Sequence, residues 1–176
     1  MVYKSINILV SSAGRRVGLI ECFRRAAKVL EVDLKVFACD VDPDVSAACA
    51  VADKAFSVPA YGHPDFVSRL AEIAAANDIR LIVPTIDPEL LPLAMAADGF
   101  ATFGCRVHVS TPGVIDVVRD KLETMRVLER ADVPVPRTGS LEEVRDELDR
   151  WTWPLFLKPN AGSASRLVSV VRSPAE

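Results

Sequence analysis

Short apolar runs alternate with longer amphipathic stretches over residues 5–110, and this alternation restricts the possible folds more than any other feature of the sequence. The runs of strand length are 5–12, 34–39, 55–58, 80–84 and 107–110. The amphipathic stretches are 15–30, 64–76 and 88–97, and in the first of them apolar residues recur three or four positions apart, as on one face of a helix. Because parallel strands need crossover connections of this kind, the alternation predicts an α/β fold with a parallel sheet.

The pattern changes at residues 111 and 112. Thr111 is a suitable helix cap and Pro112 a suitable first-turn residue, so a helix is expected to begin there. Beyond it we expect helices over 121–130 and 140–150, an extended segment over 133–138, and a hairpin of strands 154–158 and 167–172. We therefore predict a doubly wound, Rossmann-like domain over residues 1–111, followed by a partial α+β subdomain over residues 112–176.

Charge and hydropathy narrow the range of partners. The net charge is −3, and Lys and Arg are interspersed with slightly more Asp and Glu, so the chain offers no basic surface for a nucleic acid. No apolar run is long enough to span a bilayer. The first run is followed by Arg15 and Arg16 rather than by a signal-peptide cleavage pattern. We expect a cytoplasmic protein that binds neither nucleic acid nor membranes.

The cysteines do not form a recognisable motif. Their spacing matches neither a zinc site nor a redox-active pair. They are therefore expected to be buried free thiols in a reducing compartment; the four residues are Cys22, Cys39, Cys49 and Cys105.

The turn after the first strand is the first candidate site. It joins a strand to a helix and so presents backbone N–H groups where an anion can dock. Gly14 and Gly18 lie in it without the third glycine of the dinucleotide fingerprint, which gives a nicotinamide cofactor little support. We take Gly14 and Arg15 as candidate substrate-binding residues. The alternative is a tight turn that any such junction needs.

Polar side chains follow the ends of two other strands. Asp42, close to Asp40, follows the second strand, and Thr85, Asp87 and Glu89 follow the strand that ends at residue 84. In an open parallel sheet these strand ends share the carboxyl edge, where ligands bind, so we predict that these residues bind a substrate amine or hydroxyl groups. The alternative is that the acids which precede prolines only cap turns or helices.

Two lysines and a loop of small residues form the most specific candidate site. Lys121 follows Asp120 at the start of a helix, and Lys158 opens the loop between the last two strands. Small residues let backbone N–H groups approach phosphate oxygens, and an ammonium group supplies positive charge. Taken singly, each lysine could be a solvated surface residue. The predicted loop residues are Gly162, Ser163, Ala164 and Ser165.

The order of these segments resembles the ATP-grasp superfamily, particularly proteins similar to the carbamoyl-phosphate synthase large subunit. The similarity lies in the opening Ile-Leu-Val-Ser-Ser-Ala-Gly-Arg-Arg-Val, in Pro-Thr-Ile-Asp-Pro-Glu-Leu, in Val-Pro-Val-Pro-Arg-Thr after the Asp-Lys helix, and in Pro-Leu-Phe-Leu-Lys-Pro-Asn-Ala-Gly-Ser-Ala-Ser. It therefore covers nearly the whole chain. In one departure, Arg166 and Leu167 stand where the family loop usually continues with glycine.

The resemblance implies an ATP-dependent carboxylate–amine ligase that works through an acyl phosphate. Lys121 and Lys158 would contact the nucleotide, residues 162–165 would form a lid over its phosphates, and the first domain would be a pre-ATP-grasp domain that forms part of the substrate wall. The family uses ATP and Mg²⁺, together with small-molecule carboxylate and amine substrates. Its magnesium ligands belong to a second half that should follow the hairpin, so no metal ligand is assigned here.

Two functions from different classes follow. In the first, the chain is the N-terminal part of such a ligase and is inactive by itself. In the second, it is a stand-alone Rossmann-like module that binds a nucleotide or another small ligand, with Asp40 placed to bind a ribose. An exposed hairpin also predicts self-association, so we expect a homo-oligomer.

Overall fold

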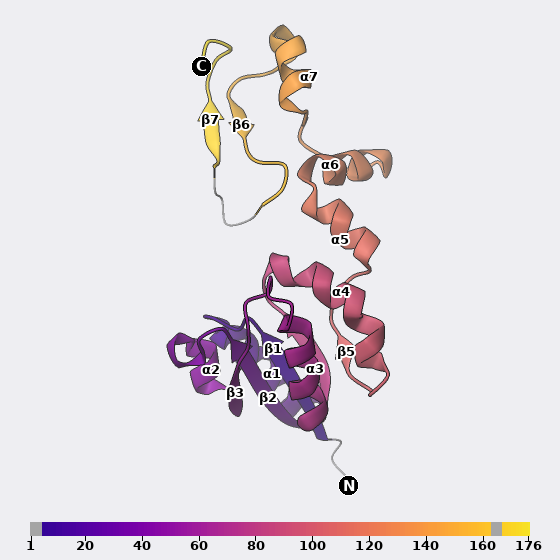
Figure 1. Cartoon of the computed structure of the whole chain (residues 1–176). Helices are drawn as coiled ribbons and strands as arrows, with labels where there is room; N and C mark the ends of the chain where they lie inside the picture. Colours follow the sequence, from indigo (N-terminus) through magenta and orange to yellow (C-terminus); the bar gives the residue numbers. More distant parts are fainter. Residues whose placement is uncertain (1–4, 163–166) are drawn as a thin grey trace. The chain divides into compact units, whose positions relative to one another are not determined.

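The computed structural model describes residues 5–162 and 167–176 (Figure 1). The chain divides into two compact units, residues 1–112 and residues 113–176. We call them the sheet unit and the second unit and describe each by itself.

The sheet unit contains a parallel sheet with the strand order β3-β2-β1-β4-β5 (Figure 1). The strands are β1 (Ser5–Ser11), β2 (Asp33–Asp40), β3 (Lys54–Ser57), β4 (Ile79–Pro84) and β5 (Arg106–Val107). The predicted α/β fold with a parallel sheet is therefore confirmed. The chain leaves β1 toward β2 on one side and leaves β4 toward β5 on the other. The carboxyl ends of β1 and β4 thus form the switch point at which doubly wound sheets bind ligands.

Helices cover both faces of this sheet. They are α1 (Val17–Val29), α2 (Ala47–Val51), α3 (Phe66–Ala76) and α4 (Asp87–Ala101), with a 3-10 turn at Pro43–Val45. Neighbouring residues of β1 point to opposite faces, as strand geometry requires. Leu9 packs in one buried cluster with Phe66 of α3 and Leu93 of α4, and Val10 packs in the other with Ile20 of α1.

Several predicted boundaries differ from the structure. The 3-10 turn and α2 are absent from the prediction, because small residues give this short segment no clear periodicity. Ser46 starts α2 by accepting a hydrogen bond from the Cys49 N–H at 3.2 Å. Strand β5 covers only two residues, and α4 continues to Ala101 rather than ending near residue 97.

The cysteines are free, but they are not all buried. Cys39, Cys49 and Cys105 are buried, and Cys22 is exposed, so the prediction of four buried thiols is wrong for Cys22. Cys22 lies two positions from the buried Ile20 on α1, which places it near the opposite face of the helix. Burial raises the pKa of Cys39 to about 12 and that of Cys105 to about 11.

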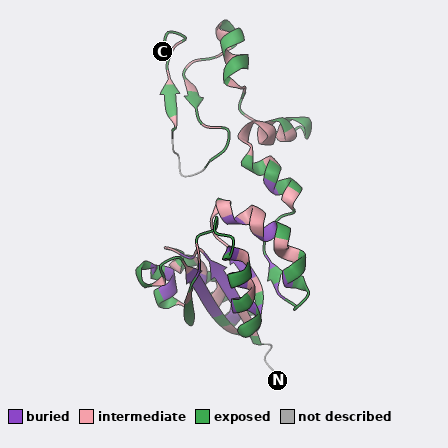
Figure 2. Ribbon diagram, viewed as in Figure 1, coloured by how far each residue is buried: buried purple, intermediate pink, exposed green. Residues whose placement is uncertain are grey.

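The second unit is built differently. Its elements are α5 (Pro112–Arg119), α6 (Lys121–Arg130), α7 (Leu141–Asp146), a 3-10 turn (Leu148–Arg150) and the antiparallel strands β6 (Leu155–Leu157) and β7 (Ser169–Val171). The predicted helix over 140–150 is thus interrupted after Asp146. Among residues 113–162 and 167–176, Ile115 is the one buried side chain. Figure 2 shows the contrast, since purple is concentrated in the sheet unit.

None of the helices in the described part of the chain combines the length and the apolar character that a membrane span needs.

Candidate functional site

Glu89 forms a buried hydrogen-bonded network at the switch point of the sheet. Its side chain is fully buried in the first turn of α4. One carboxylate oxygen, Oε2, accepts hydrogen bonds from the hydroxyls of Ser11 at 2.7 Å and Ser12 at 2.9 Å. The other, Oε1, accepts them from the N–H groups of Thr85 at 2.7 Å and Ile86 at 3.3 Å. Glu89 therefore ties the loop after β1 to the loop after β4.

Thr85 belongs to the same network. Its hydroxyl donates to the carbonyl of Ser12 at 2.6 Å, and its own carbonyl accepts a hydrogen bond from Arg16 Nη2 at 3.4 Å. The structure thus brings two of the predicted substrate residues, Thr85 and Glu89, into direct contact. The polar groups of both side chains bind the loop after β1, so in this structure they connect it to the loop after β4.

Gly14 and Asp40 form a second contact at this edge. The Gly14 N–H donates to Asp40 Oδ2 at 2.7 Å, and Asp40 Oδ1 accepts from the Val41 N–H at 2.8 Å. Gly14 has a φ of +46°, in the left-handed region that favours glycine. This arrangement favours the tight-turn interpretation of the loop. Each oxygen of Asp40 thus accepts one backbone N–H, so this side chain orders the loops after β1 and β2.

The other three predicted substrate residues lie on the surface of the same edge. Arg15 and Asp87 are exposed, with Asp87 at the first position of α4. Asp42 is also exposed and caps the 3-10 turn by accepting the Asp44 N–H at 3.2 Å. Within the described residues, no hydrogen bond or ion pair joins these three side chains to one another.

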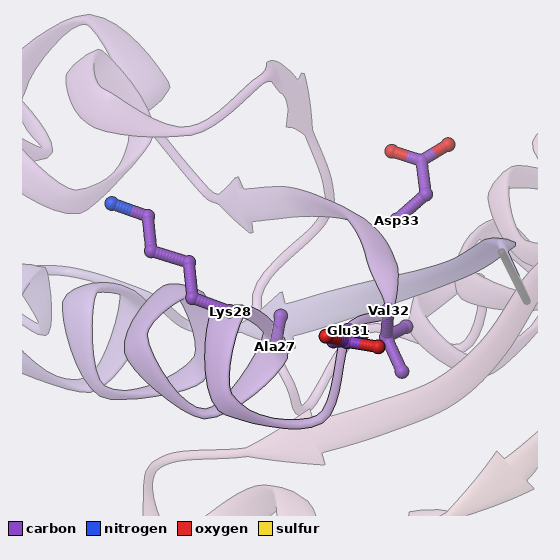
Figure 3. Close-up of a pocket in the computed structure, with 5 residues that line it drawn as sticks. All are labelled: Ala27, Lys28, Glu31, Val32 and Asp33. Atoms are coloured by element: carbon purple, nitrogen blue, oxygen red, sulfur yellow. The ribbon is translucent and has the colours of Figure 1, made fainter.

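The sheet unit also has a hollow of about 510 Å³ at the opposite edge of the sheet. Figure 3 shows its lining, Ala27, Lys28, Glu31, Val32 and Asp33, at the end of α1 and the start of β2. The ammonium of Lys28 and the carboxylate of Asp33 extend in different directions, and none of the predicted site residues lines the hollow. A substrate site at the carboxyl edge and this hollow are therefore separate places.

Lys121 contacts the small-residue loop in the second unit. Its ammonium Nζ donates to the carbonyls of Asn160 at 3.1 Å and Gly162 at 2.9 Å, although the two segments are about forty residues apart. The structure thus brings Lys121 into contact with Gly162, one of the predicted loop residues. Lys158 is exposed immediately after β6. The predicted loop residues Ser163, Ala164 and Ser165 lie outside the described residues.

Asn160 and Asp120 complete this cluster, which we call the Asn160 clasp and define as Asp120, Lys121, Leu122 and Asn160. Asn160 Nδ2 donates to Asp120 Oδ2 at 2.8 Å, and Asn160 Oδ1 accepts the Leu122 N–H at 2.9 Å. Asp120 Oδ1 also accepts the Glu123 N–H at 2.7 Å. The pKa of Asp120 is lowered, first by that backbone N–H and then by the amide of Asn160.

Sequence reasoning assigned no role to Asn160. Its place in a loop of small residues gives no sign of which side chain it contacts, and its partner Asp120 is forty positions away. Asp120 carries a visible signal, since an acid directly before a helical stretch is a typical N-cap. Among the described residues, no group of three or more His, Cys, Asp or Glu side chains is placed to hold a metal ion.

Comparison with known proteins gives one family and a set of similar folds. Residues 8–108 match the family described as PylC-like, N-terminal domain. The biotin carboxylase domain dimer of 2-oxoglutarate carboxylase from Hydrogenobacter thermophilus, solved with MgADP, ADP and bicarbonate, is 24% identical with a TM-score of 0.63 over 95% of this chain and 37% of that chain. No curated protein matches the chain.

Two further solved structures are similar. Pyruvate carboxylase from Rhizobium etli is 23% identical with a TM-score of 0.66, and the match covers 98% of this chain and 16% of that chain. L-amino acid ligase from Bacillus licheniformis is 14% identical with a TM-score of 0.60, and the match covers 99% of this chain and 41% of that chain. The chain therefore spans less than half the length of each of these proteins and shares their fold.

Proposed function

Because the chain belongs to the PylC-like N-terminal domain family, we propose that it is the N-terminal part of an ATP-grasp enzyme, an ATP-dependent carboxylate–amine ligase. The observation that carries the proposal is the contact between Lys121 and the small-residue loop, since the ammonium lies against the carbonyls of Asn160 and Gly162. A cation at a small-residue loop is suited to neutralise a phosphate group.

Two hydrogen bonds fix the position of the Lys121 ammonium, which keeps its positive charge. A lysine ammonium has three N–H groups, and among the described residues two of them donate to protein acceptors, the loop carbonyls. The third is available to a phosphate oxygen. Lys158, exposed at the end of β6, adds a second positive charge at the base of the same loop. Together the two lysines would bind the phosphates of ATP.

The reaction that this site would serve has two steps. A substrate carboxylate oxygen attacks the γ-phosphorus of ATP, which forms an acyl phosphate and releases ADP. The nitrogen of an amine then attacks the acyl carbon, forms the C–N bond and displaces phosphate. The lysines would stabilise the negative charge on the transferring phosphoryl group. The carboxyl edge of the sheet unit, with Arg15, Asp42 and Asp87 exposed, would form part of the wall for the carboxylate or amine substrate.

We further propose that this chain supplies the two lysines of the ATP site, and that the magnesium ligands of the complete enzyme come from a part of it outside these 176 residues. Support comes from the lengths of the similar proteins, of which the chain covers 37% and 41% in two cases. On this proposal the 176-residue chain binds ATP but does not turn it over. Release of ADP from ATP and Mg²⁺ by the purified chain would contradict that part.

A homo-oligomer and a cytoplasmic location complete the proposal. The H. thermophilus structure is a dimer, and exposed apolar side chains such as Phe156 and Leu157 on β6 are suited to self-association. Light scattering at several protein concentrations tests this part, and a monomer at every concentration would count against it.

Titration calorimetry with ATP and Mg²⁺ tests the central proposal. Lys121→Gln and Lys158→Gln each remove one charge, and each is expected to raise the Kd for ATP about tenfold or more, because hydrogen bonds to charged groups contribute about 1.5–3 kcal/mol. Lys28→Gln, on the exposed face of α1, is the matched control and should leave the Kd within about twofold. Equal Kd values for all four proteins would overturn the proposal.

The alternative, a stand-alone module that binds a dinucleotide or another small ligand at the switch point, has less support. The Glu89 network joins the loops after β1 and β4, and Asp40 already accepts the Gly14 and Val41 N–H groups, so a ligand there would have to share these acceptors with the backbone. Thermal stabilisation by NAD, with none by ATP, would favour this alternative.

A further inference from the structure

The backbone N–H groups in the first turn of α6 donate hydrogen bonds to Asn160, in the loop after β6, and to Asp120. The first three N–H groups of a helix have no partner within the helix. Here the Lys121 N–H donates to the Asn160 carbonyl at 3.2 Å, and the Leu122 N–H donates to Asn160 Oδ1 at 2.9 Å. The Glu123 N–H donates to Asp120 Oδ1 at 2.7 Å. These three N–H groups of α6 are thus already bound to protein acceptors. A phosphate here would therefore be contacted by the ammonium of Lys121 and not by the N–H groups of the helix.

Asn160 makes most of the hydrogen bonds between the loop and the start of α6. Its backbone carbonyl accepts hydrogen bonds from both the N–H and the Nζ of Lys121. Its side chain binds Asp120 and the Leu122 N–H on either side of that lysine. A lysine side chain is flexible, and ordering it costs conformational entropy. Because the ammonium already donates to the carbonyls of Asn160 and Gly162, the side chain of Lys121 is ordered before a ligand binds.

We propose that Asn160 is a positioning residue, which, with Asp120, holds the loop against α6 so that the ammonium of Lys121 lies where the phosphates of ATP bind. This inference rests on the proposed function, because it assigns the clasp to the same nucleotide site. Asn160 itself need not contact the nucleotide. Its effect is exerted through Lys121.

A purely structural role makes a different prediction. When Asn160 is changed, the Asp120 side chain still caps α6 through the Glu123 N–H, so the helix should persist. A structural role would therefore leave ATP binding unaffected once the protein is folded. A positioning role requires ATP affinity to follow the hydrogen bond between residues 120 and 160.

An exchange of the two side chains tests the inference in the whole chain. Asn160→Asp places two carboxylates 2.8 Å apart, and Asp120→Asn places two amides there. The double variant restores one carboxylate and one amide in the reverse order, with acceptors for the Leu122 and Glu123 N–H groups retained. Each single variant is expected to raise the Kd for ATP about tenfold, and the double variant is expected to return it to within about threefold of the wild type.

Ser140→Ala is the control, because it removes a helix cap that has no part in the proposed ATP site. Ser140 caps α7 by accepting the Glu143 N–H at 3.2 Å, so its loss should weaken α7 and leave the Kd for ATP unchanged. If the two single variants bind ATP as the wild type does, or if the double variant binds no better than they do, the inference is overturned.

The exchange rates of the Lys121 and Leu122 amide protons, followed by NMR, separate this inference from the proposed function. Both rates should rise in the single variants and fall again in the double variant. If the wild type binds no ATP but the rates behave in this way, the proposed function fails while the clasp itself is established. If the rates do not change, the clasp does not hold Lys121 and the inference fails.

Discussion

The two units of the chain reach their structures by different means. In the sheet unit, side chains from both faces of β1 are buried against helices, and Leu9 and Val10 are both 0% exposed. In the second unit, Ile115 is the one buried side chain among the described residues, and the contacts are caps, ion pairs and the Asn160 clasp. Burial of apolar side chains contributes much more free energy than exposed polar contacts do.

This difference explains where the candidate chemistry lies. At the carboxyl edge of the sheet unit, Thr85 and Glu89 are committed to one another and to the loop after β1. In the second unit, Lys121 and Lys158 carry positive charge on surface elements that a ligand can approach. On the proposed function, the second unit would therefore bind the phosphates, and exposed residues of the sheet unit such as Arg15 would contact the other substrate.

Leu9→Ala should have the largest effect on stability, and it tests the comparison most strongly. Removing a fully buried leucine side chain costs about 2–5 kcal/mol. Phe156→Ala, at a side chain that is 66% exposed, is the matched change in the second unit and should cost less than about 0.5 kcal/mol. Urea unfolding followed by far-UV circular dichroism measures both. Similar costs for the two variants would refute the contrast between the units.

Glu89→Ala should have the next largest effect. It leaves the buried Ser11 hydroxyl, the half-buried Ser12 hydroxyl and two backbone N–H groups without their acceptor, and hydrogen bonds to a charged group contribute about 1.5–3 kcal/mol. We expect a loss of about 2–4 kcal/mol in the free energy of unfolding. Asp87→Ala, two residues earlier on the exposed side of the same turn, should cost less than about 1 kcal/mol. An equal cost at the two positions would show that the Glu89 network is not formed.

The buried thiols should make the stability of the sheet unit fall at high pH. Cys105 has a folded pKa of about 11 against an ordinary value of 9.0, so the unfolded state loses this proton first as the pH rises. Between pH 8 and pH 10 this thiol should account for a loss of about 1 kcal/mol. Urea unfolding at both pH values should therefore show a smaller loss in Cys105→Ala than in Cys22→Ala, whose thiol is exposed. The same loss in both variants would contradict the prediction.

Arg137→Ala should have the smallest effect, and it tests the polar contacts of the second unit. The guanidinium of Arg137 lies 4.2 Å from the centre of the Trp151 ring. A cation–π contact of this kind contributes about 0.5–1 kcal/mol at an exposed site. With Trp153 changed to Phe, the remaining tryptophan reports this contact, and its emission should shift in Arg137→Ala but not in Arg145→Ala, on α7. An unchanged emission would mean that the ring and the cation are not stacked.

Much of the fold could be predicted from the sequence. The strands of the sheet unit are continuous apolar runs because both faces of the sheet are covered, and such runs are visible without any structure. The α/β fold and the ATP-grasp resemblance are confirmed. Helix α2 was missed because a five-residue helix of small side chains shows no periodicity.

The site was harder to predict because it depends on pairings between distant residues. Glu89 was expected to bind a substrate, and its place after a strand gave no sign that the hydroxyls of Ser11 and Ser12 would donate hydrogen bonds to its carboxylate. Asn160 was not assigned a role, since its contact with Asp120 arises only when β6 and α6 are brought together. Composition and spacing locate the segments that could bind a ligand, but they do not show which polar groups are already occupied.

Hydrogen exchange of the whole chain, with and without ATP and Mg²⁺, tests the central claim most directly. If the second unit binds the phosphates, ATP should slow exchange in segments 120–123 and 155–162, which contain the Asn160 clasp and Lys158, and should leave the sheet strands unchanged. Protection confined to the loops after β1 and β4, around Ser12 and Thr85, or no protection anywhere, would contradict it.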